Sequence, residues 1–174
     1  MQFDNLSMRG LAAELGVPVM TVYNYVPNKR ALFDLMSDHL LRPIEVPPPE
    51  VGTWDVRMRQ LQREARSAVT RHPGLRLTAG IGQSAEAARL ADGVMSILAD
   101  GGFTPKAAEL AFTTVFTFML GQIELDAMAS SLAGEAAALG PVDSRSARRD
   151  DLFEFAFDVI LDGLNARLRP SAGS

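Results

Sequence analysis

The sequence predicts an all-α protein, and three observations lead to that prediction. Apolar residues recur at helical spacing along much of the chain. Alternating β-branched residues nowhere persist long enough to propose a sheet. Glycines and prolines divide the chain into helix-sized pieces, without an internal repeat. We therefore expect short helices near the N-terminus and longer ones after a proline-rich break.

Composition narrows the class of protein. The 174 residues are 47% hydrophobic and 22% charged, as in an ordinary globular protein. Cysteine is absent, which excludes disulfides, thiolate metal sites and a cysteine nucleophile and fits the cytoplasmic location that we expect. No apolar run approaches the length of a membrane span, and the start lacks a signal-peptide pattern. Because the net charge is −4, any binding to nucleic acid depends on where the basic residues lie.

The chain divides at residues 43–52, PIEVPPPEVG, which hold four of the ten prolines. Proline lacks the amide donor and clashes with the preceding turn, so no helix continues through this stretch. We predict two domains, residues 1–42 and residues 43–174.

The first domain begins with two short helices joined by a glycine turn. Ser7 is a good N-cap, and Leu11 and Leu15 space the apolar face of the first helix. Gly16 can adopt the positive φ that a sharp turn needs. The second helix covers residues 18–25, with the proline in its first turn and Val22 facing inward.

A third helix follows the second, after Val26-Pro27. Asn28 caps it, and its apolar side holds Leu32, Leu35, Met36 and Leu40. Two short helices joined by a glycine, the second presenting small polar and aromatic residues, have the geometry that fills a DNA major groove. A helical hairpin that merely packs is the alternative.

The second domain is predicted to hold longer helices. They cover residues 53–72, 84–99, 105–128 and 148–168, with Thr53 as a cap, residues 100–102 as a stop, and Thr104-Pro105 as a start. Residues 130–150, rich in small and polar side chains, are interpreted as a mobile loop.

The last two long helices are apolar nearly all round and so predict burial on several sides. On residues 105–128 one stripe holds Phe112, Val115, Phe116, Met119, Leu120 and Ile123. On residues 148–168 one face holds Phe153, Phe157, Ile160 and Leu164. We expect an interface between two copies, to which Phe157 and Ile160 contribute. A purely internal core is the alternative.

Polar residues among these apolar ones are candidates for a ligand site, because a pocket needs apolar walls and a few polar groups. They are Thr113, Thr114, Thr117, Gln122 and Glu124. We predict that Phe112, Thr113, Phe116 and Thr117 contact a small apolar or amphipathic effector. Each threonine could equally bond back to its own helix.

The N-terminal motif resembles the DNA-binding headpiece of the tetracycline-repressor (TetR) family. The matching residues are Leu6-Ser7, Leu11-Ala12, Leu15-Gly16-Val17, Thr21-Val22-Tyr23-Asn24-Tyr25 and Asn28-Lys29-Arg30-Ala31-Leu32. Residue types and spacings agree over about thirty positions. Softer matches follow in the family's order: the Trp54 helix, Arg71-His72-Pro73, Gly102-Phe103, residues 118–121, 153–155 and 161–164.

The resemblance implies roles for headpiece residues in binding double-stranded operator DNA. It places Arg9 at a base edge, where guanine offers two acceptors, and Lys29 on a phosphate at a helix N-terminus. It assigns the recognition helix Val19, Met20, Thr21, Tyr23, Asn24 and Tyr25. Among these we expect Thr21 and the tyrosine hydroxyls on phosphate, Asn24 on a base, and Val19 or Met20 on a thymine methyl.

The resemblance also implies a ligand-responsive transcriptional regulator, a repressor, that binds a palindromic operator as a homodimer through its last two long helices. Metal is not expected. Only His39 and His72 are present, His72 is interpreted as a helix-end cap, and residues 77–83 lack the metal-binding histidine of the tetracycline repressors. We therefore expect no cofactor and an effector other than a magnesium–tetracycline chelate.

Two other functions are weighed. An enzyme on a helical scaffold is disfavoured because no nucleophile, base and orienting group recur at workable spacing. A helical small-molecule-binding or interaction protein without effective DNA binding remains the alternative, because the family headpiece has a helix before Ser7 and only MQFDNL precedes it here. We expect the intact protein to begin some tens of residues earlier. Residues 1–42 also balance four basic against four acidic side chains, so we expect weak DNA affinity from this chain.

Overall fold

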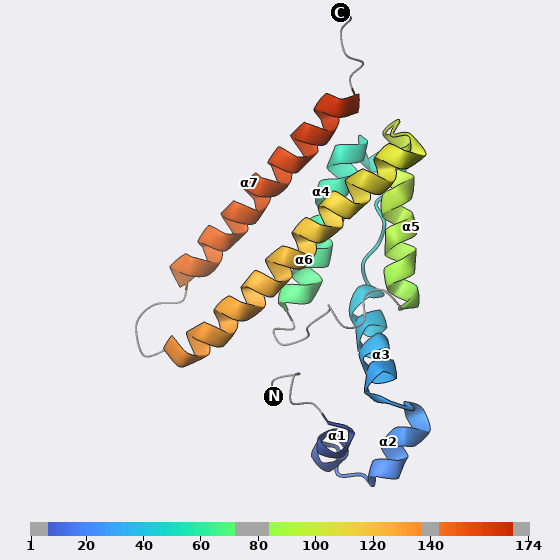
Figure 1. The fold of residues 1–174 in the computed structure, drawn as a ribbon, viewed down its shortest axis with the longest axis vertical. Helices are drawn as coiled ribbons and strands as arrows, with labels where there is room; N and C mark the ends of the chain where they lie inside the picture. Colours follow the sequence, from blue (N-terminus) through green and yellow to red (C-terminus); the bar gives the residue numbers. More distant parts are fainter. Residues whose placement is uncertain (1–6, 72–83, 137–142, 169–174) are drawn as a thin grey trace, which may run out of the picture. The chain divides into compact units, whose positions relative to one another are not determined.

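The computed structural model describes residues 7–71, 84–136 and 143–168, and the regular structure within these ranges is entirely helical (Figure 1). This confirms the all-α prediction. In chain order the elements are α1 (Met8–Glu14), α2 (Val19–Tyr25), α3 (Lys29–Leu41), the 3-10 helix η2 (Pro49–Val51), α4 (Trp54–Thr70), α5 (Ala85–Asp100), α6 (Pro105–Ala136) and α7 (Asp143–Leu168).

The chain falls into two compact units. The first comprises residues 1–46 and 61–93, and the second comprises residues 47–60 and 94–174. Because α4 and α5 are continuous helices, each contributes residues to both units. The division into domains at residues 42 and 43 stays a prediction.

Of the three helices of the headpiece, α1 to α3, the first and the third begin where the sequence predicts caps. The Ser7 hydroxyl accepts a hydrogen bond from the Gly10 amide at 3.0 Å, and the Asn28 side chain accepts one from the Ala31 amide at 2.9 Å. Each cap satisfies an amide that the first turn of a helix leaves without a partner. Pro18 precedes α2 with an extended backbone, φ −58° and ψ 142°, instead of lying in its first turn.

Gly16 makes the turn between α1 and α2. Its φ is +65°, and the amides of Gly16 and Val17 donate back to the carbonyls of Ala13 (3.2 Å) and Ala12 (3.0 Å). This bonding pattern, with a left-handed residue just past the helix, is the Schellman motif that ends many helices. The predicted glycine turn is confirmed.

The inner faces of α1 and α2 meet in a small apolar core. Met8, Ala12, Val22 and Val26 are buried, and Leu11, Val17, Val19, Ala31 and Leu32 pack partly buried against them. The inward position predicted for Val22 is confirmed. The position predicted for Leu15 is wrong, because this residue ends α1 and its side chain is exposed.

The inner face of α3 differs in part from the prediction. Ser37, Leu40 and Leu41 are buried on it, whereas Leu35 is exposed. Leu35 lies two residues before Ser37, about 160° away around the helix axis, and therefore faces the other side.

The proline-rich segment interrupts the α-helices as predicted, with only η2 inside it. One of its carbonyls accepts a hydrogen bond from a buried arginine of the second unit. Arg57 is 4% exposed, its Nε donates to the Pro47 carbonyl at 2.9 Å, and its Nη1 lies 2.7 Å from Asp100 Oδ2. These bonds satisfy a charge that burial would otherwise strongly disfavour.

In the second unit, α4 begins beside the end of α5. The rings of Trp54 and Phe103 meet edge to face at 5.0 Å, and the indole N–H donates to Asn165 Oδ1 at 3.2 Å. A Cβ on Gly101 would lie 2.6 Å from Trp54 Cγ, so only glycine fits there. Gly102, with φ +87°, turns the chain at the predicted stop.

The last two helices are longer than the sequence predicts. α6 continues to Ala136 instead of residue 128, and α7 begins at Asp143 instead of residue 148. Most of the predicted mobile loop is therefore helical, because alanines in residues 127–136 favour a helix without any apolar periodicity. Residues 137–142 of that loop lie outside the described residues, as do His72 and residues 77–83.

Helices of the described ranges are either too short or too polar to cross a bilayer.

Candidate functional site

The outer face of α2 presents side chains that no neighbour in the headpiece covers. Val22 is buried on the inner face, and Met20 and Asn24, two residues to either side, lie about 160° away around the axis. Asn24 is exposed and Met20 is 65% exposed. An amide and a flexible apolar side chain at the centre of this face suit a base edge and a thymine methyl.

Two tyrosines and a threonine flank this centre. Tyr25 is 83% exposed, Tyr23 is exposed, and Thr21 is half-buried. Val19, by contrast, packs partly buried against the apolar core of the headpiece. Met20 and Asn24 thus share the outer face, with Thr21 and Tyr23 about 80° to either side of its centre. Tyr25 lies farther around the helix, and Val19 is shared with the core.

Two predicted basic contacts lie on the helices beside α2. Arg9 is exposed on α1, which packs against α2. Lys29 is the first residue of α3, and its ammonium lies 5.5 Å from the centroid of the Phe33 ring. This cation–π contact holds the lysine near the start of the helix, where amides also favour an anion.

The predicted effector residues lie on α6 in the second unit. Phe112 and Phe116 are half-buried and their rings stack at 5.6 Å, with 9° between the planes. The exposed Thr113 donates to the Glu109 carbonyl at 2.8 Å, which is the back-bonding that the sequence left open. Thr117 is exposed. Contact of these four residues with an effector stays a prediction.

The helices α6 and α7 lie side by side within one chain (Figure 1), and aromatic rings join them. Phe118 stacks on Phe153 at 5.4 Å and lies 6.2 Å from Phe157, and the last two rings are 5.9 Å apart. Phe157 is only 2% exposed in the single chain. Its predicted place in an interface between copies is therefore wrong, because the same chain already covers it.

The outward sides of α6 and α7 carry a different set of residues, a mixture of exposed apolar side chains, threonines and glycines, which we call the exposed stripes. On α6 the stripe holds Leu110, Thr114, Thr117, Gly121, Leu125 and Met128. On α7 it holds Leu152, Phe155, Val159 and Gly163. A Cβ added to Gly121 or Gly163 would meet no atom within 4 Å. Sequence reasoning missed these stripes because both helices are apolar on every side.

An arginine ties α4 to α7 within the second unit. Arg59 Nη1 lies 2.7 Å from Asp55 Oδ2, and its Nε lies 2.8 Å from Asp158 Oδ1. The hydrogen bond to Asp158 raises the pKa of Arg59 above its ordinary value, against the opposing effect of burial. Burial also acts to raise the pKa of Asp55, but hydrogen bonds from Thr53 and Arg59 outweigh it and leave this pKa below 3.8.

The sequence of the chain is similar to those of known transcriptional repressors. Residues 46–138, more than half of the chain, match the family model of the tetracyclin repressor-like C-terminal domain. The tetracycline repressor protein class A from transposon 1721 of Escherichia coli is 30% identical over 94% of this chain and 83% of its own length. HTH-type transcriptional repressor DrrR1 of Streptomyces coeruleorubidus is 44% identical over 41% of this chain, but only 27% of that repressor is matched.

Solved structures give the same result for the fold. ActR, a TetR family protein of Streptomyces coelicolor solved with (S)-DNPA, has a TM-score of 0.73 and 27% identity over 95% of this chain and 90% of that chain. BioQ, solved with its natural double-stranded DNA operator, has a TM-score of 0.70 and 24% identity over 94% and 87%.

Proposed function

This chain belongs to the tetracycline-repressor family of transcriptional regulators, and from that premise we propose that it is an effector-responsive repressor that binds a palindromic operator as a homodimer. The observation that carries this proposal is the outer face of α2. Its inner face packs in the headpiece core, while Met20, Asn24 and the two tyrosines remain exposed. A helix anchored on one side and free on the other is what entry into a major groove requires.

The residues of this face divide by chemistry into base readers and phosphate binders. Asn24 offers a donor and an acceptor that match the edge of adenine, and Met20 supplies an apolar contact for a thymine methyl. The hydroxyls of Tyr23, Tyr25 and Thr21 bind phosphate oxygens and fix the position of the helix on the duplex. Arg9 and Lys29 supply the positive charge that the headpiece otherwise balances with carboxylates.

Homodimerisation is proposed from the exposed stripes of α6 and α7. Exposed apolar residues in a continuous row favour an interface, and a second copy offers an identical row by symmetry. Gly121 and Gly163 leave room for a partner helix to approach closely. A two-fold dimer then presents two α2 helices to two half-sites, which explains a palindromic operator.

The effector is proposed to be a small apolar or amphipathic molecule. ActR, the relative described above, was solved in complex with (S)-DNPA and also with actinorhodin. In this chain the stacked, half-buried pair Phe112 and Phe116 offers an aromatic surface for such a molecule. As a DNA-binding regulator, the protein is proposed to act in the cytoplasm.

Operator binding is tested with the DNA that flanks the protein's own gene. A labelled duplex of this region is titrated in a gel-shift or anisotropy assay, and a scrambled duplex of equal length and composition is the control. We expect tighter binding to the native duplex, and a loss of that preference in Asn24→Ala. Equal affinity for both duplexes contradicts the proposal and favours a helical ligand-binding protein without operator recognition.

A further inference from the structure

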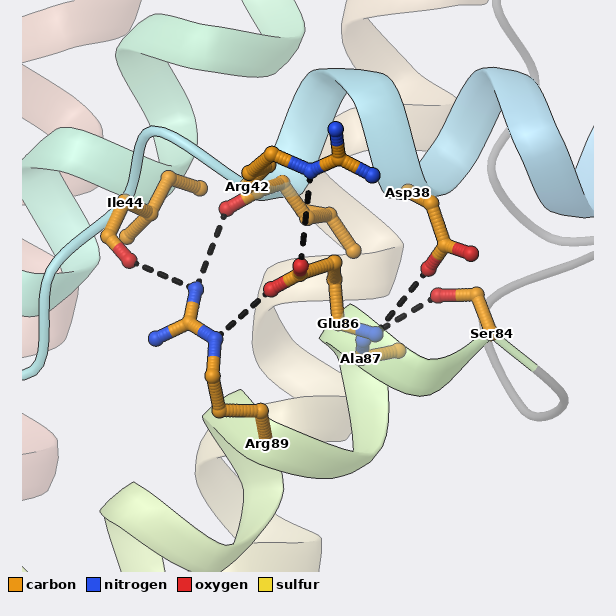
Figure 2. A network of polar contacts seen from close by, with 8 residues as sticks. Asp38, Arg42, Ile44, Ser84, Glu86, Ala87 and Arg89 are labelled. Carbon is orange, nitrogen blue, oxygen red and sulfur yellow. Dashed lines mark hydrogen bonds and ion pairs between the residues drawn. The ribbon is translucent and has the colours of Figure 1, made fainter.

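Two helix ends of the first unit cap one another (Figure 2). The Asp38 carboxylate of α3 accepts a hydrogen bond from the Glu86 amide, in the first turn of α5, at 3.0 Å. In return, Arg89 of α5 donates through Nη2 to the Ile44 carbonyl at 2.8 Å, three residues beyond α3, and to the carbonyl of Leu41, the last residue of α3, at 3.4 Å. Asp38 thus satisfies an amide that the first turn of α5 leaves without a partner, and Arg89 ties α5 to the chain that leaves α3. We call this arrangement the clasp.

The clasp adds to the local cap of α5. Ser84 is 3% exposed, and its hydroxyl accepts a hydrogen bond from the Ala87 amide at 3.0 Å. The Glu86 amide is not served by that hydroxyl and depends on Asp38 from another helix. The first turn of α5 is therefore complete only while α3 is in place.

Charge reinforces the clasp at Glu86. Its carboxylate lies 2.7 Å from Arg89 Nε and 3.6 Å from Arg42 Nε. The Arg42 side chain is 70% exposed, so its longer ion pair with Glu86 contributes little. The backbone bonds made by Asp38 and Arg89 are shorter and directional, and we place the strength of the clasp in them.

The clasp bears on the recognition helix through the chain itself. α3 begins at Lys29, four residues after the last residue of α2, and Ala31 and Leu32 of α3 pack against the core that holds Val22. At its other end α5 continues to Val94, Ile97 and Leu98, which are buried. A displacement of α3 away from α5 by about 1 Å would lengthen both the bond of Asp38 to the Glu86 amide and the bond of Arg89 to the Ile44 carbonyl beyond the normal range.

We propose that Asp38 and Arg89 are positioning residues for operator recognition: their reciprocal capping holds α3, and with it the recognition helix, in the orientation that binds DNA. This inference rests on the proposed operator binding. A dimer must present two recognition helices at a fixed spacing of about 34 Å. Disorder of α3 therefore lowers affinity through the entropy lost on binding, although neither residue touches DNA.

The test compares clasp variants with matched controls. Asp38→Ala and Arg89→Gln each remove one half of the clasp, and Asp38→Asn keeps an oxygen that accepts the Glu86 amide. Asp92→Ala and Arg71→Gln remove an exposed charge of the same sign elsewhere in the first unit. Affinity for a duplex carrying the DNA upstream of the protein's own gene is measured well below the melting temperature of every variant, and amide hydrogen exchange is measured without DNA.

We expect Asp38→Ala and Arg89→Gln each to weaken operator binding about tenfold, because each loses a hydrogen bond involving a charged group. Asp38→Asn and the two controls are expected to stay within about threefold of the original chain. Exchange should accelerate at α1, α2 and the last turn of α3 in the clasp variants only. A general loss of stability would instead accelerate exchange throughout the molecule and would not be relieved by asparagine.

Two results overturn the inference. One is unchanged operator affinity in both Asp38→Ala and Arg89→Gln. The other is unchanged exchange at α1 and α2 in both variants, which decides against the clasp even if the original chain shows no operator preference. Absence of operator preference in the original chain contradicts the proposed function, and the inference about the clasp is then decided by the hydrogen-exchange experiment. If Asp38→Ala does not fold, Arg89→Gln and the recovery in Asp38→Asn carry the decision.

Discussion

Gly16 is the residue on which the turn of the helix-turn-helix depends. Its φ of +65° lies in the left-handed region, and a Cβ there would meet no atom within 4 Å. A side chain at this position would thus strain the backbone through its φ and would not collide with any neighbouring residue. We expect Gly16→Ala to lower the free energy of unfolding by about 1–2 kcal/mol, measured by thermal or urea unfolding.

Asparagine provides the control for this position, because it tolerates the left-handed region better than alanine. Gly16→Asn should recover part of the loss although its side chain is larger. Equal losses in the two variants would mean that space, and not φ, decides which residue fits.

Lys29 is expected to bind phosphate. Replacing it with alanine removes one of the few positive charges at the proposed DNA-binding face and should weaken binding to every duplex by a similar factor. The slope of log affinity against log salt should become shallower by about 1, because one fewer counterion is released. Arg71→Ala serves as the charge control, and an unchanged slope in Lys29→Ala would assign the lysine to its Phe33 contact alone.

Local patterns predicted individual residues well where one side chain acts on its own backbone. Ser7 and Asn28 cap helices because their side-chain oxygens reach amides three residues ahead. Gly16 makes the turn because glycine, which has no Cβ, adopts a positive φ without steric strain. Asp38 and Arg89 were missed for the opposite reason. Their partners are 48 and 45 residues away, and nothing in the sequence near either residue indicates that distance.

At the scale of elements, helix positions were predictable and their buried faces only partly so. Prolines and glycines mark where helices stop, whereas the small and polar residues near the end of α6 lack an apolar periodicity and so do not predict the helix that forms there. On α6 the small residues Ala108 and Ala111 are buried while Leu110 and Leu125 are exposed. Hydrophobicity alone predicts buried leucines and exposed alanines, because it does not show which side of α6 packs closely against a neighbouring helix.

The contact of α4 with α7 should make stability depend on pH. Because the pKa of Asp55 is lowered in the folded state, its ion pair with Arg59 stabilises the fold above the ordinary pKa of 3.8. That contribution is lost as pH falls through the lower folded-state pKa. We expect the melting temperature to fall below about pH 4, and to fall less steeply in Asp55→Asn.

Asp162→Asn is the control for this titration, since it removes an exposed carboxylate from α7. It should leave the steepness of the acid transition unchanged. The same steepness in Asp55→Asn and in the original chain would show that other carboxylates govern acid unfolding.

At the scale of the whole molecule, an interface between copies on α6 and α7 stays a prediction, and Phe157, one of the two residues that the sequence assigns to it, is buried within the single chain. The sequence indicates that α6 and α7 have more apolar surface than one chain's core can cover. It does not show that Phe153 and Phe157 already stack on Phe118 of the same chain. The surface that we propose for a partner is the pair of exposed stripes.

An exposed and a buried phenylalanine of α7 should respond differently to replacement by a charged residue. Phe155 is 69% exposed in one chain, so Phe155→Glu should leave a folded protein and raise the dimer dissociation constant by about a hundredfold or more, as for an aromatic interface anchor. Phe157 is 2% exposed, so Phe157→Glu should prevent folding, because it buries a charge without a partner. Sedimentation equilibrium measures the first effect and circular dichroism the second.

Gly121→Leu separates close packing from charge repulsion at the same interface. The added side chain meets no atom of its own chain at Cβ, and leucine favours the helix over glycine, so the folded monomer should be at least as stable as before. If partner helices approach closely at this glycine, the dimer must nevertheless weaken. A variant that is more helical, folded and dimeric at the original concentration would place the dimer interface away from the exposed stripes.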